Sequence, residues 1–260
     1  MVQILNVYAL PTLVTSADLA GGAAVVIDVL RATTSMVYLL EAGAKGIIPC
    51  QEIDEARQQA AQLPAGEVLL AGERHALPID GFDLVNSPSQ CTPQRVAGKT
   101  IVLTTTNGTR AVLAARHARR VLIGAFVNVT AVYEQLLMED QVHLICSGTD
   151  GHYSQDDVLL AGLLVERLVR SRGLPCQLNA QALTARETWL AAFPVPMALG
   201  GEPLEPQRLA RELQKSPGGQ RLTQLGLVQD VLDAACIDRF RSVPELLPGQ
   251  GVIRLHGGLS

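Results

Sequence analysis

The stretch TIVLTTTNGTRAVLAARHARRVLIG, residues 100–124, contains the alternation that decides the fold. It begins with a short apolar run typical of a buried strand and continues through small polar residues into helical spacing over about 109–117. A second apolar run starts at Val121. A strand, a helix and a further strand at this spacing are typical of a β-α-β unit with parallel strands.

The same alternation extends over most of the chain. Apolar runs predict further strands at 23–30, 46–50, 67–72 and 142–148. Helical spacing predicts helices at 33–43, 52–63, 128–137 and 155–171. Strands separated by helices of this length predict an α/β protein with a largely parallel sheet.

Two regions interrupt this rhythm. Residues 73–99 contain three prolines and turn-forming residues, which indicates a long functional loop or a small insertion. Residues 194–206 carry four prolines and are typical of a linker into a C-terminal helical region over about 207–240. We expect a single domain over 1–260, and we leave open a C-terminal sub-lobe over about 195–260.

Composition excludes several classes of protein. The 260 residues include 48% hydrophobic residues and carry a formal net charge of −4, so no basic surface for nucleic acid or an anionic membrane is expected. The five cysteines form no CxxC pair, which is typical of reduced thiols. No apolar run is long enough to span a bilayer, and the N-terminus lacks the pattern of a signal peptide. We therefore expect a cytoplasmic protein without a nucleic-acid or membrane partner.

Polar residues are concentrated where the predicted strands end. In an open parallel sheet, the carboxyl ends of the strands share one edge, and ligands bind in the crevice there. Five separate segments would thus contribute hydroxyls, acids and arginines to one site. These residues are Asp28, Arg31, Thr33 and Thr34; Glu73 and Arg74; Thr104, Thr105, Thr106, Asn107, Gly108 and Thr109; Asn128; and Ser147, Thr149, Asp150, Asp156 and Asp157.

The segment TTTNGT, residues 104–109, has two interpretations. Hydroxyl and amide side chains accept hydrogen bonds from the first N–H groups of a helix, so helix capping is one role. The same N–H groups and the positive end of the helix dipole bind anions such as phosphate, which is the other role. Because one side chain suffices for a cap, so many small polar residues favour anion binding here.

Asp28 follows four apolar residues, where a carboxylate is costly unless it is paired or bound to a metal. One interpretation is a structural pair with Arg31 or with the backbone. The other is a Mg²⁺ site formed by Asp28, Glu73 and Asp157, since Mg²⁺ favours a few carboxylate oxygens. Arg31 and Arg74 would then bind an oxyanion.

Several motifs together identify a resemblance to a known family. In order along the chain they are VVIDVLRATTS (25–35), AGER (71–74), GFDLVNSP (81–88), LTTTNGT (103–109), GAFVN (124–128), SGTDG with the following DD (147–157) and DVLDAACIDRFRSVP (230–244). This set resembles the ComB family of 2-phosphosulfolactate phosphatases. The resemblance implies a three-layer α/β/α fold with a mixed, largely parallel sheet. It also implies Mg²⁺-dependent hydrolysis of 2-phospho-3-sulfolactate to 3-sulfolactate and phosphate, a step toward coenzyme M.

The strand-end pattern and the resemblance together assign roles to individual residues. The expected partner is a small phosphorylated acid, either this substrate or a related 2-hydroxy-acid phosphate, and a homodimer is left open. The catalytic assignments are Asp28, Arg31, Arg74 and Asn107, and the Mg²⁺ ligands are Asp28, Glu73 and Asp157. The substrate-binding assignments are Thr33, Asn86, Ser87, Thr104, Thr105, Thr106, Gly108, Thr109 and Asn128.

Two questions stay open at this point. Asp28 is either a nucleophile that forms a phosphoenzyme or a metal ligand. The alternative function is a non-catalytic binding protein for a phosphorylated or sulfonated metabolite, which would need the TTTNGT segment and the arginines but no metal. Leu160 and Ala234 stand where the family pattern has cysteine, so a thiol nucleophile is not expected.

Overall fold

The structure is a computed structural model that describes residues 3–171, 175–194, 204–247 and 249–255. The described residues form one eleven-stranded sheet in the order β5-β4-β6-β3-β11-β10-β7-β2-β8-β1-β9. The strands are β1 (Gln3–Tyr8), β2 (Ala23–Ile27), β3 (Gly46–Cys50), β4 (Val68–Gly72), β5 (Leu84–Val85), β6 (Thr100–Thr104), β7 (Arg120–Gly124), β8 (Gln141–Cys146), β9 (Cys176–Leu178), β10 (Pro244–Leu247) and β11 (Val252–Leu255).

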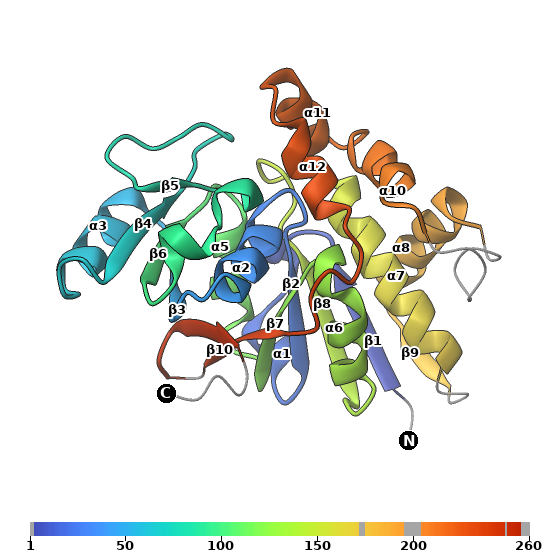
Figure 1. Cartoon of the computed structure of the whole chain (residues 1–260). Helices are drawn as coiled ribbons and strands as arrows, with labels where there is room; N and C mark the ends of the chain where they lie inside the picture. Colours follow the sequence, from blue (N-terminus) through green and yellow to red (C-terminus); the bar gives the residue numbers. More distant parts are fainter. Residues whose placement is uncertain (1–2, 172–174, 195–203, 248, 256–260) are drawn as a thin grey trace.

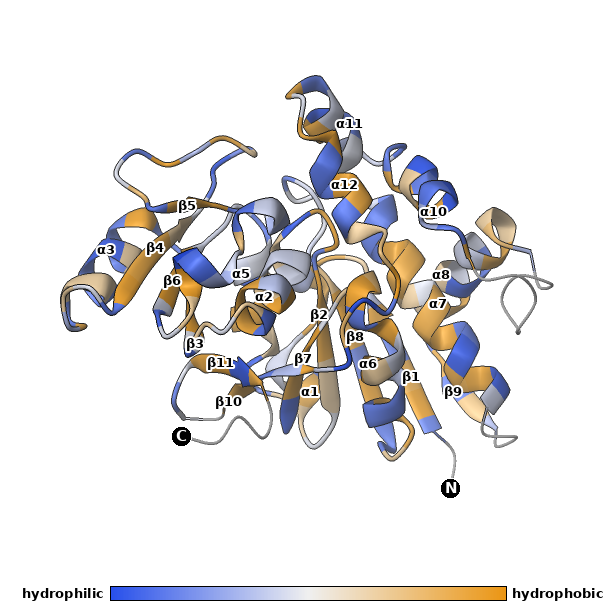
Figure 2. Ribbon diagram, in the orientation of Figure 1, coloured by the Kyte–Doolittle hydropathy of each residue, from blue (hydrophilic) through white to orange (hydrophobic). Residues whose placement is uncertain are grey.

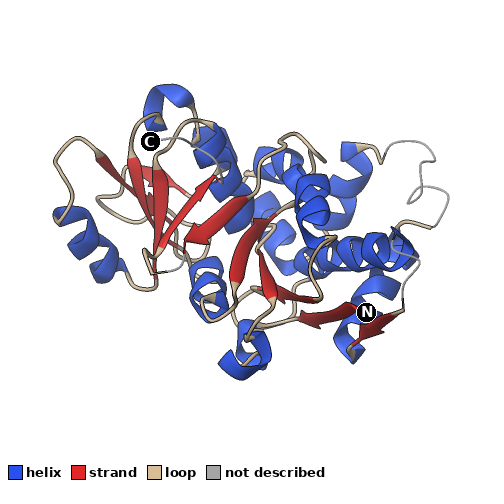
Figure 3. Ribbon diagram, turned by 90° about the horizontal axis from the view of Figure 1, so that it is seen from below, coloured by secondary structure: helices blue, strands red, loops and turns tan. Residues whose placement is uncertain are grey.

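Helices cover both faces of this sheet (Figures 1 and 3). The helices are α1 (Ser16–Leu19), α2 (Ala32–Glu41), α3 (Ile53–Ala61), α4 (Pro93–Val96), α5 (Gly108–Ala115), α6 (Val129–Leu136), α7 (Gln155–Ser171), α8 (Ala180–Ala192), α10 (Pro206–Leu213), α11 (Pro217–Gln224) and α12 (Val228–Ala234). Three short 3₁₀ turns lie at Pro11–Leu13, Pro88–Gln90 and Phe126–Asn128.

The central strand β2 shows how the layers form. Its residues are all buried, and successive side chains point to opposite faces. Val25 and Ile27 pack into one core with α6, α7 and α8. Ala24 and Val26 pack into the other core with α2 and α5. Figure 2 shows the apolar strands between helices whose outer faces are hydrophilic. The expected three-layer α/β/α arrangement is therefore confirmed.

The sheet is mixed because a C-terminal hairpin joins two parallel parts. Strands β5-β4-β6-β3 pair in parallel, as do β7-β2-β8-β1-β9. The antiparallel hairpin β10–β11 lies between them and pairs with β7 through Glu245 and Leu122 and with β3 through Ile253 and Ile47. The last described residues thus lie inside the sheet, beside strands that are more than 100 positions away in sequence.

Most predicted elements are confirmed, with differences both at the ends of the chain and within it. The predicted strand 23–30 ends at Ile27, and the 73–99 segment contains β5 and α4. Strands β1, β9, β10 and β11 were not predicted. The predicted linker at 194–206 falls mainly on 195–203, outside the described residues. In the part of the chain that the structure describes, no helix is long and apolar enough to cross a membrane.

Candidate active site

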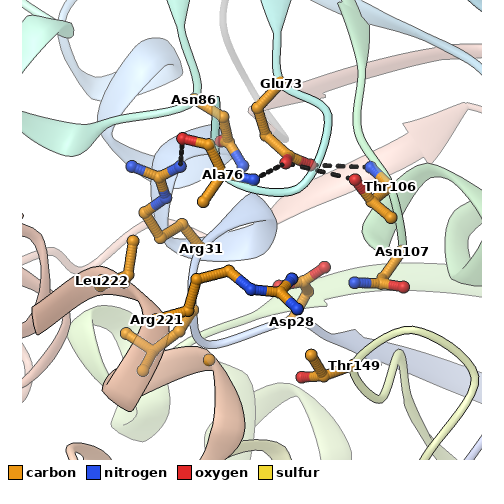
Figure 4. A pocket seen from close by; sticks show the side chains of 12 residues that line it. Asp28, Arg31, Glu73, Ala76, Asn86, Thr106, Asn107, Thr149, Arg221 and Leu222 are labelled. Atoms are coloured by element: carbon orange, nitrogen blue, oxygen red, sulfur yellow. Dashed lines mark hydrogen bonds between the residues drawn. The ribbon is translucent and has the colours of Figure 1, made fainter. Parts of the chain in front are cut away.

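A polar pocket of about 40 Å³ lies at the carboxyl ends of β2, β4 and β6, where α11 approaches the sheet (Figure 4). Seven of the predicted site residues meet there. They are Asp28, Arg31, Glu73, Asn86, Thr106, Asn107 and Thr149, and the remaining lining residues are Leu30, Ala76, Gly218, Arg221 and Leu222. The strand ends thus converge as the parallel-sheet rule predicts.

Asp28 is the buried carboxylate at the end of β2. Its backbone is fixed by Thr33, whose hydroxyl accepts a hydrogen bond from the Asp28 N–H at 3.0 Å and donates one to the Asp28 carbonyl at 2.9 Å. One carboxylate oxygen accepts a hydrogen bond from the Ala32 N–H at 3.1 Å. A Cβ atom at Gly108 would lie 2.6 Å from Asp28 Oδ2, so the first turn of α5 approaches this carboxylate as closely as glycine allows.

Burial raises the pKa of Asp28 to about 7. The neighbouring charges of Asp156 and Glu73 act in the same direction, while the hydrogen bond from the Ala32 amide opposes them. Burial also raises the pKa of Asp156, whose carboxylate accepts a hydrogen bond from Ser154. Several carboxyl groups crowded into a desolvated place favour a cation or a proton among them.

Glu73 joins the loop after β4 to the loop after β6. Its Oε1 accepts a hydrogen bond from the Thr106 N–H at 2.7 Å, and its Oε2 accepts bonds from the Ala76 N–H at 2.6 Å and the Thr106 hydroxyl at 3.2 Å (Figure 4). Three donors therefore hold this buried carboxylate in place. The TTTNGT segment is therefore held in position by an acid in the loop after β4.

Asn86 contributes a buried oxygen without a partner. The side chain lines the pocket and is buried, and its Oδ1 has no hydrogen-bond partner among the described residues. A buried polar atom left without a partner costs free energy of order 1–3 kcal/mol. Because this atom lies at the pocket, a ligand that supplies a cation or a donor would remove that cost.

Arg31 lines the pocket, but its guanidinium is paired with the buried carboxylate of Asp230. Its Nη1 lies 2.6 Å from Asp230 Oδ2, and both side chains are at most 3% exposed. Asp230 Oδ1 also accepts a hydrogen bond of 2.6 Å from the Ser87 hydroxyl. The structural pair considered between Arg31 and Asp28 is therefore wrong, and the actual partner is an acid on α12.

Asp157 lies away from the pocket lining and is surrounded by donors. Its Oδ1 accepts a hydrogen bond from the Val29 N–H at 2.8 Å, and its Oδ2 accepts three bonds from Ser147 and Gly148 at 3.0 to 3.1 Å. The three predicted metal ligands are accordingly not gathered into one set. Within the described ranges, no three His, Cys, Asp or Glu side chains are arranged to hold a metal ion.

Arg74 faces a neighbouring cavity instead of this pocket. Its guanidinium donates to the carbonyls of Glu73 at 2.9 Å and Gln51 at 3.0 Å, and to the Thr104 hydroxyl at 2.9 Å. The buried Thr104 hydroxyl is thus already hydrogen-bonded within the protein. Arg74 keeps its position through neutral acceptors alone.

The TTTNGT segment divides its two roles between neighbours. The Thr105 hydroxyl accepts a hydrogen bond from the Thr109 N–H at 3.2 Å, and the Thr109 hydroxyl donates to the Thr105 carbonyl at 3.1 Å, so this pair caps α5. Thr106 and Asn107 line the pocket. Asn128 is also structural, since its amide bonds the backbone of Ala125 and of Ile123.

Comparison with known proteins assigns the chain to a family. The family model described as 2-phosphosulpholactate phosphatase matches residues 8–248. The chain belongs to the 2-phosphosulpholactate phosphatase family. The resemblance carried by the seven motifs is thereby confirmed.

Curated relatives of this family share most of the chain. A probable 2-phosphosulfolactate phosphatase of Deinococcus radiodurans is 40% identical over 233 residues, which cover 88% of this chain and 89% of that protein. Proteins of the same name from Thermotoga petrophila and Symbiobacterium thermophilum are each 38% identical. They are covered over 92% and 96% of their lengths, and cover 89% and 91% of this chain, respectively. The similarity therefore extends over nearly complete family members.

Sequence reasoning missed the two C-terminal contributors to the site, Asp230 and Arg221. Arg221 on α11 lines the pocket, and its Nη2 lies 2.6 Å from Asp150 Oδ2. Neither residue follows a predicted strand, so the strand-end pattern does not find them. The contact between Arg31 and Asp230 spans 199 positions and has no local signal.

Proposed function

We propose that this family member is a Mg²⁺-dependent phosphatase that hydrolyses 2-phospho-3-sulfolactate, or a related 2-hydroxy-acid phosphate, to the 2-hydroxy acid and phosphate. Family membership supports phosphatase chemistry. The observation that carries the proposal is the buried Asn86 oxygen without a partner among the described residues, which lines one pocket with Asp28 and Glu73. That pocket lies where an α/β sheet binds its ligands.

The donor set fits Mg²⁺. This ion binds one or two carboxylates together with waters and substrate phosphate oxygens, and does not require an all-protein cage. Asp28, Asn86 and Glu73 would hold it, with Glu73 already fixed by its three donors. When bound, Mg²⁺ would neutralise charge on the phosphoryl oxygens and so ease attack at phosphorus.

The remaining pocket residues would bind the phosphoryl group. Asn107 uses its Oδ1 to accept a hydrogen bond of 3.2 Å from the Asp150 N–H, which leaves its amide nitrogen to donate toward the pocket (Figure 4). Arg221 extends across the same pocket, and the N–H groups of its guanidinium that are not engaged by Asp150 would donate to the phosphoryl oxygens. Preorganised donors and a cation around the transferred group are the main source of catalysis in phosphoryl transfer.

Arg31 has a positioning role in this proposal. Its pair with Asp230 ties the start of α2 to α12, and Asp230 in turn holds Ser87, the neighbour of Asn86. The C-terminal helices and the 84–88 segment are thereby fixed around the pocket. Binding of the phosphoryl group falls to Arg221 and Asn107.

A substrate screen tests the proposal. Phosphate release from 2-phospho-3-sulfolactate, 2-phospholactate and the phosphoglycerates is measured with Mg²⁺ and with a chelator, using the wild type, Asp28→Asn and the exposed control Asp54→Asn. We expect Mg²⁺-dependent turnover that Asp28→Asn lowers by orders of magnitude and Asp54→Asn leaves unchanged. No turnover of any compound, with stabilisation on ligand addition, would instead establish the non-catalytic binding protein.

The role of Asp28 in the chemistry is decided separately. A phosphoaspartate at Asp28 would be trapped by hydroxylamine during turnover and would give retention of configuration at phosphorus. Direct attack by water would give inversion and no trapped adduct.

A further inference from the structure

A second cavity of about 310 Å³ adjoins the proposed active pocket. The two share Thr106 and Asn107 as a common wall. The cavity is lined on its other sides by Arg74 and by Arg110, which lies in the first turn of α5. A molecule that reaches past Thr106 and Asn107 from the active pocket would therefore enter this cavity.

Two arginines without an acidic partner in the described ranges face the cavity. The half-buried Arg74 bonds only to the neutral acceptors described above and forms no ion pair within the described residues. Arg110 is exposed, and for its side chain the described part of the chain offers no hydrogen bond or ion pair. One guanidinium is thus fixed in place and the other is unengaged.

Neither of the two acids that line the cavity forms an ion pair with these arginines. Asp150 pairs with Arg221 at 2.6 Å and lies 3.6 Å from His75. Glu52 also lines the cavity, at the start of α3, and makes no ion pair with either arginine. Planar guanidinium groups match the oxygens of carboxylates and sulfonates, so this cavity suits an anion.

The other arginines of the site are less suited to a second anion. Arg31 is buried against Asp230, and removing it from that acid would leave a buried charge unpaired. Arg221 lines the active pocket itself and is already paired with Asp150. A second anionic group on the same substrate would thus reach Arg74 and Arg110 first.

We propose that Arg110, together with Arg74, forms a second anion subsite that selects phosphate monoesters carrying an additional carboxylate or sulfonate. The proposal rests on the proposed function, because it places the phosphoryl group in the pocket of Asp28 and Asn86. Thr106 and Asn107 form the shared wall between the two anions. Arg110 thereby determines specificity, while the hydrolytic residues lie on the other side of this wall.

Arg110→Gln and Arg110→Lys test the subsite, with Arg116→Gln at the opposite end of α5 as the matched control. For each variant, kcat/KM is measured for 2-phospho-3-sulfolactate and for ethyl phosphate, which lacks a second anion. A charge-assisted hydrogen bond at an exposed position corresponds to about a tenfold effect. We expect Arg110→Gln to lower the ratio of the two values about tenfold, mainly through KM, and Arg110→Lys to lower it less. Arg116→Gln should keep the wild-type ratio.

Binding of 3-sulfolactate by calorimetry separates this proposal from the proposed function. If the wild type hydrolyses neither ester but binds 3-sulfolactate about tenfold more tightly than Arg110→Gln does, the phosphatase function is overturned and the anion subsite is supported. If Arg110→Gln retains both the wild-type kcat/KM ratio and the wild-type affinity for 3-sulfolactate, the subsite is overturned while hydrolysis can stand.

Discussion

Removing the charge of Asp28 should stabilise the metal-free protein while it abolishes activity. Burial raises the pKa of Asp28 from 3.8 to about 7. A carboxyl group with a raised native pKa contributes its full stability below pH 3.8 and loses it as the pH rises through about 7. At about 1.4 kcal/mol per pH unit, the complete loss corresponds to about 4 kcal/mol. An amide at this position keeps an acceptor for the Ala32 N–H and never ionises.

The measurement is urea unfolding of the wild type and Asp28→Asn between pH 5.5 and pH 8.5 with a chelator present. We expect Asp28→Asn to be more stable by about 2 kcal/mol at pH 5.5 and by about 4 kcal/mol above pH 7. Asp54→Asn, in an exposed pair with Arg57, should show no such dependence. A difference in the free energy of unfolding between Asp28→Asn and the wild type that stays constant with pH would refute the conclusion that Asp28 is desolvated. A less stable Asp28→Asn at pH 8.5 would refute it as well. With Mg²⁺ bound to the wild type, the difference should shrink.

Three further predictions follow from the contacts of the pocket. Asp230→Ala should lower the free energy of unfolding in urea by about 3–5 kcal/mol, because it leaves Arg31 charged and buried, and adding Arg31→Met should recover most of the loss. Gly108→Ala should lower kcat/KM about a hundredfold by displacing Asp28, whereas an unchanged value would contradict the close approach. Asn86→Leu should keep or raise stability in urea yet weaken Mg²⁺ binding about tenfold by calorimetry, and full Mg²⁺ affinity would remove Asn86 from the metal site.

Local sequence patterns predict the site residues at the strand ends but not the C-terminal residues that complete the site. Asp28, Glu73 and Thr106 each follow an apolar run, so the geometry common to parallel sheets is enough to bring them together. Strands β10 and β11 escape prediction because β10 begins with proline and contains Glu245, which is buried beside Arg120 on β7 at 3.0 Å. The ion pair between Arg120 and Glu245 joins residues 125 positions apart, so the local spacing of apolar residues does not predict it.

Hydrogen-bond satisfaction separates the polar residues that build this site from those that are open to a ligand. Asp157 accepts four hydrogen bonds and only holds loops in place, whereas Glu73 accepts three and still lines the pocket. Sequence position alone makes them resemble Asp28, since all three are acids near strand ends. Asn86 has the opposite character, because its buried oxygen has no partner among the described residues. Within the TTTNGT segment the same distinction holds: Thr105 and Thr109 satisfy each other and cap α5, which leaves Asn107 to donate toward the ligand.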